Sequence, residues 1–260
     1  MTWFEHQWKQ LRFNRLNFER NYVVDQVLSE KPRSRVMLTR RHGGSRRTIM
    51  KLCDPAAANP LEVQCLRSVR HPGVACYLGH GFTRRREYWI ETEYVDGVPL
   101  SSWLDERSGV TKQADADRGR IFLQLLATVQ YLHCCGWIHG DLSPQNVLVC
   151  PTSCRVVLVD FEHASVIGSA STNMRRKHSL DFASPREIIG GKTTESCEQF
   201  ALGKLGTLVF GHYNGEGRER FQAILARATS HRPEDRYPDL RALVRDVESA
   251  MKQVSHDVIR

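Results

Sequence analysis

The stretch His139-Gly-Asp-Leu-Ser-Pro-Gln-Asn-Val-Leu-Val149, followed by Val156-Val-Leu-Val-Asp-Phe-Glu162, decides the fold of this chain. It places a carboxylate (Asp141), an amide oxygen (Asn146) and a second carboxylate (Asp160) within twenty residues, each next to an apolar run typical of a β-strand. Phosphoryl transfer needs these groups, because one carboxylate must receive a hydroxyl proton and two hard oxygen ligands must hold Mg²⁺ on the triphosphate. One such residue alone is more typical of a turn or a cap, but the ordered set predicts a phosphotransferase site.

The same segment resembles the catalytic loop and the metal-binding loop of the protein kinase superfamily, H-R-D-L-x-x-x-N and D-F-G, with Gly140 for Arg and Glu162 for Gly. The resemblance implies ATP as the phosphate donor and Asp141 as the base that accepts the hydroxyl proton. It implies that Asn146 and Asp160 hold Mg²⁺, with Mn²⁺ as a possible substitute. It also implies an α+β, bilobal fold, with a small β-rich first lobe that carries one helix and a mainly α-helical second lobe.

Motifs of the first lobe precede this segment in kinase order. Thr48-Ile-Met-Lys51 is similar to the V-A-I-K strand, whose Lys contacts the α- and β-phosphates, and Glu62 fits the helical acid that orients this Lys. Glu62 is also the third residue of a helix that starts at Pro60, so a purely structural capping role stays open. Glu93-Tyr-Val95 resembles the hinge that binds adenine through backbone groups, which assigns Glu93 and Val95 to the nucleotide.

The glycine-rich loop of kinases is missing. Its three glycine positions hold Ser29, Lys31 and Ser34. Glycines let backbone amides approach phosphates closely, so side chains here are expected to weaken or reshape nucleotide binding, while Lys31 is expected to supply charge directly. Ser143 stands where the catalytic-loop Lys usually contacts the γ-phosphate.

Motifs of the second lobe follow the metal-binding loop. Ala183-Ser-Pro-Arg-Glu187 resembles a displaced A-P-E segment, whose acid is expected to pair with Arg236. Glu198-Gln-Phe-Ala-Leu-Gly203 resembles D-x-W-S-L-G, the helix whose acid anchors the catalytic loop. Only a short helix is expected before the Arg-Pro segment at Arg232, where kinases usually place a docking helix and an insert. A hydrophobic stack joining the lobes is expected from Leu66, Tyr77, His139 and Phe161.

The pattern of apolar residues predicts three regions: an extension over residues 1–20, a β-rich lobe over 21–95, and a helical lobe over 96–260, with the boundary at Asp96-Gly97. In the β-rich lobe, two strands are expected around a Gly43-Gly44 turn, and in the helical lobe an apolar stripe at helical spacing runs from Ile121 to Leu132. A cleft between two such lobes is a favoured ligand site. In the extension, Phe4, Trp8, Leu11, Arg15 and Phe18 recur at helical spacing. This spacing predicts a short amphipathic helix that packs on the body of the protein, with contact to a partner or an acidic membrane surface as the alternative.

Composition limits the class of protein. The net charge of +8, from 37 basic and 29 acidic residues, favours anionic partners. The basic clusters lack interleaved aromatic residues, so no specific nucleic-acid binding is expected. Eight cysteines without a C-x-x-C pair indicate a reducing compartment, the cytoplasm, or the host-cell cytoplasm or nucleus for a viral or effector protein. No apolar run approaches the roughly 18 residues that cross a bilayer.

Three functions stay open. The first is an active protein kinase that phosphorylates Ser or Thr hydroxyls of an undefined protein substrate. The second is a pseudokinase, a nucleotide-binding or interaction scaffold, because the loop glycines are absent and Ser143 replaces a Lys. The third is a small-molecule kinase, because H-G-D and D-F-E also resemble aminoglycoside and choline kinase relatives.

Overall fold

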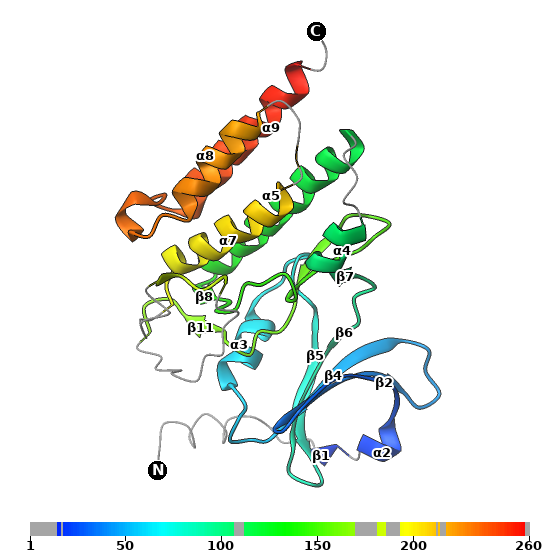
Figure 1. Ribbon diagram of the computed structural model, residues 1–260. Helices are drawn as coiled ribbons and strands as arrows, with labels where there is room; N and C mark the ends of the chain where they lie inside the picture. Colours follow the sequence, from blue (N-terminus) through cyan, green and yellow to red (C-terminus); the bar gives the residue numbers. More distant parts are fainter. Residues whose placement is uncertain are drawn as a thin grey trace. The chain divides into compact units, whose positions relative to one another are not determined.

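The computed structural model divides into two compact units. The first contains the described residues up to Arg70 together with Ala75–Val95, and the second contains His71–Val74 and the described residues from Asp96 onward. Figure 1 follows the chain in colour from the strands of the first unit, in blue and cyan, to the last helices of the second, in orange and red. The structure describes residues 15–16, 18–106, 112–169, 181–185, 193–211, 213 and 217–257.

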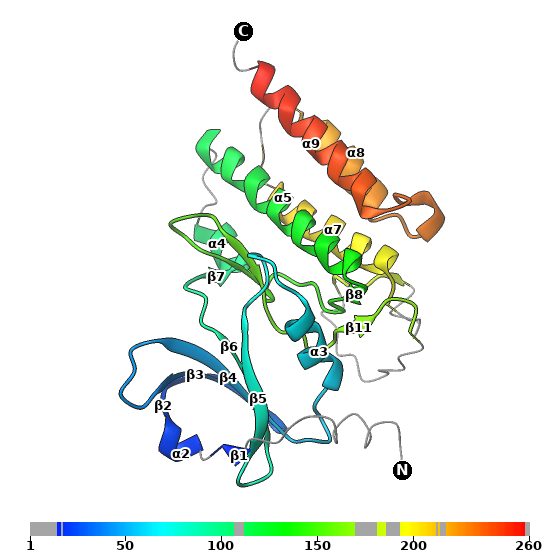
Figure 2. The same ribbon diagram turned by 180° about the vertical axis from the view of Figure 1, so that it is seen from behind.

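The first unit is a six-stranded sheet with the strand order β1-β5-β6-β4-β3-β2 (Figures 1 and 2). All neighbours pair antiparallel except β1, which lies parallel to β5. The hairpin that the sequence predicts around Gly43-Gly44 is confirmed as β3 and β4. The elements are β1 (Arg15–Leu16), α2 (Phe18–Asn21), β2 (Tyr22–Lys31), β3 (Ser34–Arg41), β4 (Arg47–Cys53), α3 (Pro60–Ser68), β5 (Tyr77–Thr83) and β6 (Tyr88–Glu93).

Helix α3 begins where the sequence predicts it. The side-chain oxygen of Asn59 accepts a hydrogen bond from the backbone N–H of Leu61 at 3.1 Å, and Pro60 occupies the first helical position, where no N–H is needed. The helix buries Val63 and Leu66. The cap therefore fixes the start of the helix, and the apolar side chains fix which face is buried.

The helix predicted over residues 1–20 is wrong at Arg15–Leu16. These two residues form β1 and pair with Phe82 and Thr83 of β5, and α2 begins only at Phe18. An open sheet edge offers unpaired N–H and C=O groups, and pairing with them outweighs a short helix that is marginal by itself. The predicted apolar positions at Phe4, Trp8 and Leu11 lie outside the described residues.

The helices of the second unit were expected from their apolar stripes. The stripe that runs from Ile121 to Leu132 is confirmed as the buried face of α5. Only α8 lies between α7 and η1 in the part of this segment that the structure describes. No helix among the described residues is long and apolar enough to cross a membrane. The elements are α4 (Leu100–Glu106), α5 (Lys112–Cys134), α7 (Glu195–Val209), α8 (Arg218–Ala228), η1 (Pro233–Asp235) and α9 (Leu240–Asp257).

Short strands hold the loops of the second unit. The strands β7 (Val98–Pro99), β9 (Val147–Val149) and β10 (Val156–Leu158) form one sheet in the order β10-β9-β7. A second pair joins β8 (Trp137–Ile138) to β11 (Ser165–Val166). The β9–β10 hairpin places the residue before β9, Asn146, next to the segment that leaves β10 toward Asp160.

The segment His71–Val74 makes its backbone contacts with the second unit, although it falls within the range expected for the first lobe. Val74 forms a parallel bridge with Leu158 of β10, and the Leu158 N–H donates to the carbonyl of Gly73 at 2.8 Å. The rings of His71 and Tyr131 stack with their centroids 4.9 Å apart. These contacts explain why the segment leaves the sheet of the first unit.

Candidate active site

The loop between β8 and β9 brings Asp141 and Asn146 together. The amide nitrogen of Asn146 donates to the Asp141 carboxylate oxygen Oδ2 at 2.9 Å and to the Asp141 carbonyl at 2.8 Å. The Asn146 backbone N–H donates to the Ser143 carbonyl at 3.1 Å, which closes the turn. Because these side-chain bonds use the amide nitrogen, the carbonyl oxygen Oδ1 of Asn146 is the atom left for a metal ion.

Asp160 lies next to this loop in a strained backbone conformation. Its φ of +60° falls in the left-handed region, which residues other than glycine rarely occupy and which often marks functional sites. The preceding residue, Val159, donates its N–H to the Asn146 carbonyl at 3.0 Å, and its own carbonyl lies 3.1 Å from Nε2 of His139. Neighbouring backbone segments therefore supply the two predicted metal ligands.

His139 and Phe161 are the two members of the predicted hydrophobic stack that belong to the second unit. Both side chains are buried, and their ring centroids are 4.6 Å apart. The other two members, Leu66 and Tyr77, belong to the first unit. The contact between His139 and Phe161 fixes the residue after Asp160 against the start of the catalytic loop.

A buried carboxylate anchors this loop from α7. The Gly140 N–H donates to Oε1 of Glu198 at 2.9 Å, which confirms the anchor that the sequence predicts. The second oxygen, Oε2, lies 2.7 Å from Nε2 of His133. Burial acts to raise the pKa of Glu198, but the hydrogen bond and attraction from His133, the attraction from His139 and the Gly140 hydrogen bond outweigh it and lower that pKa.

His133 is a site residue that the sequence analysis missed. It follows Leu132, the last member of the buried stripe of α5, and its partner Glu198 lies 65 residues later. The available signal was a polar residue at the end of an otherwise apolar helical face. A polar residue that ends such a face needs a partner, but no local pattern identifies Glu198 as that partner.

Gly140 stands where kinases usually have Arg, and the structure explains why. Its φ is +82°, and a Cβ at this position would lie 2.3 Å from the carbonyl oxygen of His163. The backbone after the Asp160-Phe-Glu162 motif therefore packs directly against Gly140. Any side chain at this position would be strained by the left-handed backbone conformation and would also clash with the His163 carbonyl oxygen.

In the first unit, Lys51 and Glu62 form an ion pair. The Lys51 ammonium lies 3.1 Å from each carboxylate oxygen of Glu62, and the side chains are only 12% and 6% exposed. Lys51 lies on β4 opposite Val36 and Ile90, and Glu62 lies in the first turn of α3. The carboxylate of Glu62 thus faces β4 as the kinase resemblance implies, and Asn59 caps the helix.

The positions that kinases fill with the glycines of the glycine-rich loop lie here in a tight hairpin between β2 and β3. Lys31 and Ser34 are the last pair between β2 and β3, which leaves a two-residue turn. Within it, Arg33 bonds the Asp54 carboxylate at 3.0 Å, and the Asp54 N–H donates to the Arg33 carbonyl at 3.0 Å. Two hydrogen bonds lower the pKa of Asp54: the bond from the Ala56 N–H has the larger effect, and the bond from the Arg33 side chain has the smaller one. The turn is therefore fastened to the residue after β4.

The predicted hinge lies at the end of β6. The Glu93 N–H donates to the Cys76 carbonyl at 2.9 Å, so this N–H is already engaged within the protein. Val95 is buried, and Arg47 lies over the ring of Tyr94 at 4.1 Å. Glu93 is thus the last residue of β6 in the sheet, and Val95 lies two residues beyond it.

The structure thus groups the predicted site residues in two sets. Asp141, Asn146 and Asp160 come together in the second unit. Of the residues in the first unit, Lys51 contacts Glu62. Lys31 ends β2, Glu93 ends β6, and Val95 lies two residues beyond β6.

The expected pair between Glu187 and Arg236 cannot be followed, because Glu187 lies outside the described residues. Arg236 is buried and donates to the carbonyls of Ser196 at 2.7 Å and Ser230 at 2.8 Å. Among the described residues, no three His, Cys, Asp or Glu side chains gather as a metal site.

Comparison with known proteins agrees with this geometry. The chain is 29% identical over 148 residues to a probable serine/threonine-protein kinase of Dictyostelium discoideum, a match that covers 55% of this chain and 28% of that protein. The curated relatives are longer proteins, of which the matches cover between 22% and 37%.

Solved structures share the fold. The Mycobacterium tuberculosis PknI kinase domain has a TM-score of 0.65 at 20% identity, covering 88% of this chain and 96% of that one. The Cydia pomonella granulovirus kinase PK-1 has a TM-score of 0.71 at 16% identity, covering 87% and 93%. A family model described as the protein kinase domain matches residues 44–253. The chain therefore belongs to the protein kinase family.

Proposed function

We propose that this chain is an active, ATP-dependent protein kinase that transfers the γ-phosphate to Ser or Thr hydroxyls. The contact between Asn146 and Asp141 supports the proposal most strongly, because it orients one carboxylate and leaves an amide oxygen for a metal ion. The names of the curated relatives, which include probable serine/threonine-protein kinases, support the choice of acceptor.

The donor atoms near Asp141 fit a magnesium ion that also binds ATP. Mg²⁺ is usually held by one or two protein oxygens together with phosphate oxygens, and seldom by a full cage of protein ligands. Asn146 and Asp160 supply two hard oxygens, and the described residues contain no larger cluster. When bound, Mg²⁺ or Mn²⁺ would neutralise negative charge on the phosphates.

The residues of the chain then have separate tasks. Asp141 accepts the proton of the attacking hydroxyl, and Asn146 holds the Asp141 carboxylate in place. Lys51 offsets charge on the α- and β-phosphates, and Glu62 holds Lys51 in position. Backbone groups of Glu93 and Val95 would bind adenine, and Lys31, which is exposed at the hairpin, would add positive charge for the phosphates.

A direct test is the transfer of labelled γ-phosphate in the presence of Mg²⁺ or Mn²⁺, including autophosphorylation, by the wild type and by Asp160→Ala. We expect transfer by the wild type and loss of at least about a hundredfold in the variant, since one metal ligand is removed. Equal transfer by the two proteins would refute the metal assignment. Protein and metabolite acceptors tested side by side separate a protein kinase from a small-molecule kinase.

A pseudokinase is the second candidate, and the hairpin at Lys31 and Ser34 favours it. Kinases use glycines here to bring amides close to phosphates, whereas this turn carries side chains and is fastened to Asp54. A Mg·ATP-dependent rise in melting temperature without turnover would support this candidate, because a ligand that binds only the native state stabilises it by mass action. Measured turnover would exclude it.

A further inference from the structure

A pocket of about 390 Å³ lies at one end of the sheet in the first unit. Three segments meet there: the turn between β2 and β3, the residues that follow β4, and the turn between β5 and β6. The strand register brings them together, because Ser34 pairs with Cys53 and Cys53 pairs with Tyr88. The charged residues that line the pocket are Lys31, Arg33, Arg35, Arg85 and Arg86, with Glu30, Asp54 and Glu87 as the acids.

The pocket is separate from the residues assigned to catalysis. Neither Lys51 nor Glu62 lines it, and of the residues assigned to the nucleotide only Lys31 does. Leu52, which lines the pocket, belongs to a buried apolar cluster with Trp89, whereas the preceding residue of β4, Lys51, contacts Glu62. Successive side chains of a strand point to opposite faces of the sheet. The wall that Leu52 provides is therefore not the surface that Lys51 offers to a nucleotide.

Two ion pairs join the three segments of the pocket. Arg33 lies 3.0 Å from the Asp54 carboxylate, which links the β2–β3 turn to the residue after β4. Arg35 lies 3.0 Å from the Glu87 carboxylate, which links β3 to the β5–β6 turn. The remaining acid, Glu30, lies opposite Arg35 in the strand register. A site whose walls are already joined loses less entropy when a ligand binds.

The ion pairs leave the pocket with an excess of positive charge. Five basic residues line it against three acids, which is an excess of two. The side chains of Lys31 and Arg86 are exposed, and neither has a hydrogen-bond or ion-pair partner among the residues that the structure describes. A phosphate monoester carries a charge of about −2 at neutral pH and offers three acceptor oxygens. Its charge and its acceptors therefore match what the pocket leaves unsatisfied.

Arg86 holds its place through an uncommon backbone conformation. Its φ of +65° lies in the left-handed region, which residues other than glycine rarely adopt and which is concentrated at functional sites. Its N–H donates to the Thr83 carbonyl at 3.0 Å and closes the turn. The chain thus accepts strain at a residue whose planar guanidinium can bind two phosphate oxygens at once.

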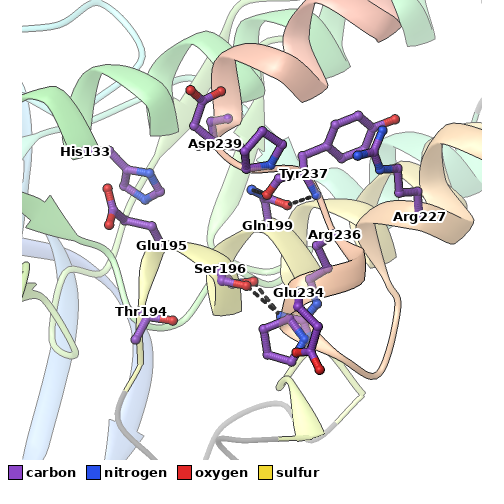
Figure 3. Close-up of a pocket in the computed structure, with 13 residues that line it drawn as sticks. His133, Thr194, Glu195, Ser196, Gln199, Arg227, Glu234, Arg236, Tyr237 and Asp239 are labelled. Carbon is purple, nitrogen blue, oxygen red and sulfur yellow. Dashed lines mark hydrogen bonds between the residues drawn. The ribbon is translucent and has the colours of Figure 1, made fainter.

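The arginines of the larger pocket in the second unit, of about 640 Å³, are engaged within the protein (Figure 3). Arg236 is buried and donates to the Ser196 carbonyl at 2.7 Å. The guanidinium of Arg227 lies over the ring of Tyr237, 4.3 Å from its centroid. An anion in that pocket would have to displace these contacts. The pocket at Arg86 is therefore the better site for an anion.

We propose that the pocket of the first unit binds the phosphate of a phosphoserine or phosphothreonine side chain in a protein partner. This binding goes beyond the proposed transfer reaction and does not depend on it. Arg86 and Lys31 donate to the phosphate oxygens, and Pro32 and Pro55 give apolar surface to the residues that flank the phosphorylated one. Because exposed turns form the walls, a side chain that projects from a partner's surface can reach the pocket.

Binding can be measured without nucleotide. The probe is a fluorescein-labelled peptide of alanine and glycine with one phosphoserine, titrated by anisotropy at low ionic strength, since salt screens exposed charges. The pocket variant is Arg86→Asn, because asparagine tolerates the left-handed conformation. The control Arg46→Asn removes the same charge from the exposed turn between β3 and β4. We expect the Kd to rise about tenfold in Arg86→Asn and less than about twofold in Arg46→Asn, with melting temperatures unchanged.

Competing ligands identify what the pocket recognises. Unlabelled phosphopeptide should displace the probe, and the same peptide with unmodified serine should do so at least about tenfold more weakly. Displacement by inorganic phosphate as effective as by phosphopeptide would overturn the proposal and assign the pocket to free anions. Displacement by Mg·ATP as effective as by phosphopeptide would overturn it and assign the pocket to the nucleotide.

The arginine variants decide whether the site is local. Equal weakening in Arg86→Asn and Arg46→Asn would show that only the overall charge attracts the peptide, and would overturn the proposal. Unchanged binding in Arg86→Asn, or no binding by the wild type, would overturn it as well. Each of these results leaves the proposed kinase activity untouched, because phosphate transfer is measured separately with Asp160→Ala.

Discussion

Glu198 accepts a hydrogen bond from the backbone N–H of Gly140 at 2.9 Å, which ties helix α7 to the residue directly before Asp141. The same carboxylate holds His133 through its other oxygen at 2.7 Å. A single buried acid thus joins two helices and the catalytic loop. Its charge state should influence both the stability of the second unit and the position of Asp141.

The Glu198→Gln variant should change how stability depends on pH. The pKa of Glu198 is lowered in the folded protein below its ordinary value of 4.5, so the unfolded chain binds the proton more readily. Its stabilisation is complete above about pH 4.5 and is lost as the pH falls through the lower folded pKa. We expect the difference in unfolding free energy between wild type and variant to shrink below pH 4.5, as measured by urea denaturation. A constant difference from pH 3 to 7 would contradict this, and Glu248→Gln, an exposed acid, serves as control.

Alanine at Gly140 should be far more harmful than alanine at Gly136. Both glycines have left-handed φ values, +82° and +81°, but only at Gly140 would a Cβ meet another atom, the His163 carbonyl at 2.3 Å. Gly136→Ala should cost about 1 kcal/mol, for the conformation alone. Gly140→Ala should cost on the order of 2–4 kcal/mol and reduce phosphate transfer, because the His163 backbone must move. If chemical denaturation showed the same loss of unfolding free energy for Gly136→Ala and Gly140→Ala, the contact with the His163 carbonyl would be unimportant.

Replacing Asp141 with Asn should remove catalysis and leave nucleotide binding intact. An amide cannot accept the hydroxyl proton, and such proton transfer contributes roughly a hundred- to ten-thousandfold to rate. Labelled phosphate transfer should fall by this amount, while the Mg·ATP-induced rise in melting temperature should persist. Asp105→Asn, an exposed position on α4, should leave both unchanged. Transfer at the wild-type rate by Asp141→Asn would exclude Asp141 as the base.

The pair between Lys51 and Glu62 allows stability and activity to be separated. Lys51→Met removes the ammonium that faces a carboxylate only 6% exposed, which should cost about 2–4 kcal/mol of unfolding free energy. Adding Glu62→Leu should restore most of this stability but no phosphate transfer, because the ammonium that binds phosphates is still missing. Recovery of transfer in the double variant would mean that the pair is purely structural.

Local patterns in the sequence predicted much of the fold. The apolar stripe from Ile121 to Leu132 predicted α5. The cap and the proline at Asn59-Pro60 predicted the start of α3. The Gly43-Gly44 turn predicted the β3–β4 hairpin. Each depends on residues close together in the chain. The order of the kinase motifs then predicted the arrangement of the remaining elements.

The sequence could not reveal features that depend on distant residues. The pairing of Arg15–Leu16 with β5 satisfies an open sheet edge far along the chain, and the contact between His133 and Glu198 spans 65 residues. The left-handed conformation of Asp160 was equally hidden, because a residue other than glycine adopts it only uncommonly. Such features result from tertiary packing and override local preference.

The hairpin tip at Arg33 has a thermodynamic consequence. Because its backbone and side chain are already bonded to Asp54, the entropy of ordering this turn is lost on folding and need not be lost again when a nucleotide arrives. Calorimetry should then show a smaller entropic penalty than a glycine-rich loop would impose. Under the proposed function, selective inhibitors would contact the ammonium of Lys31 instead of relying on a flexible loop that folds over them.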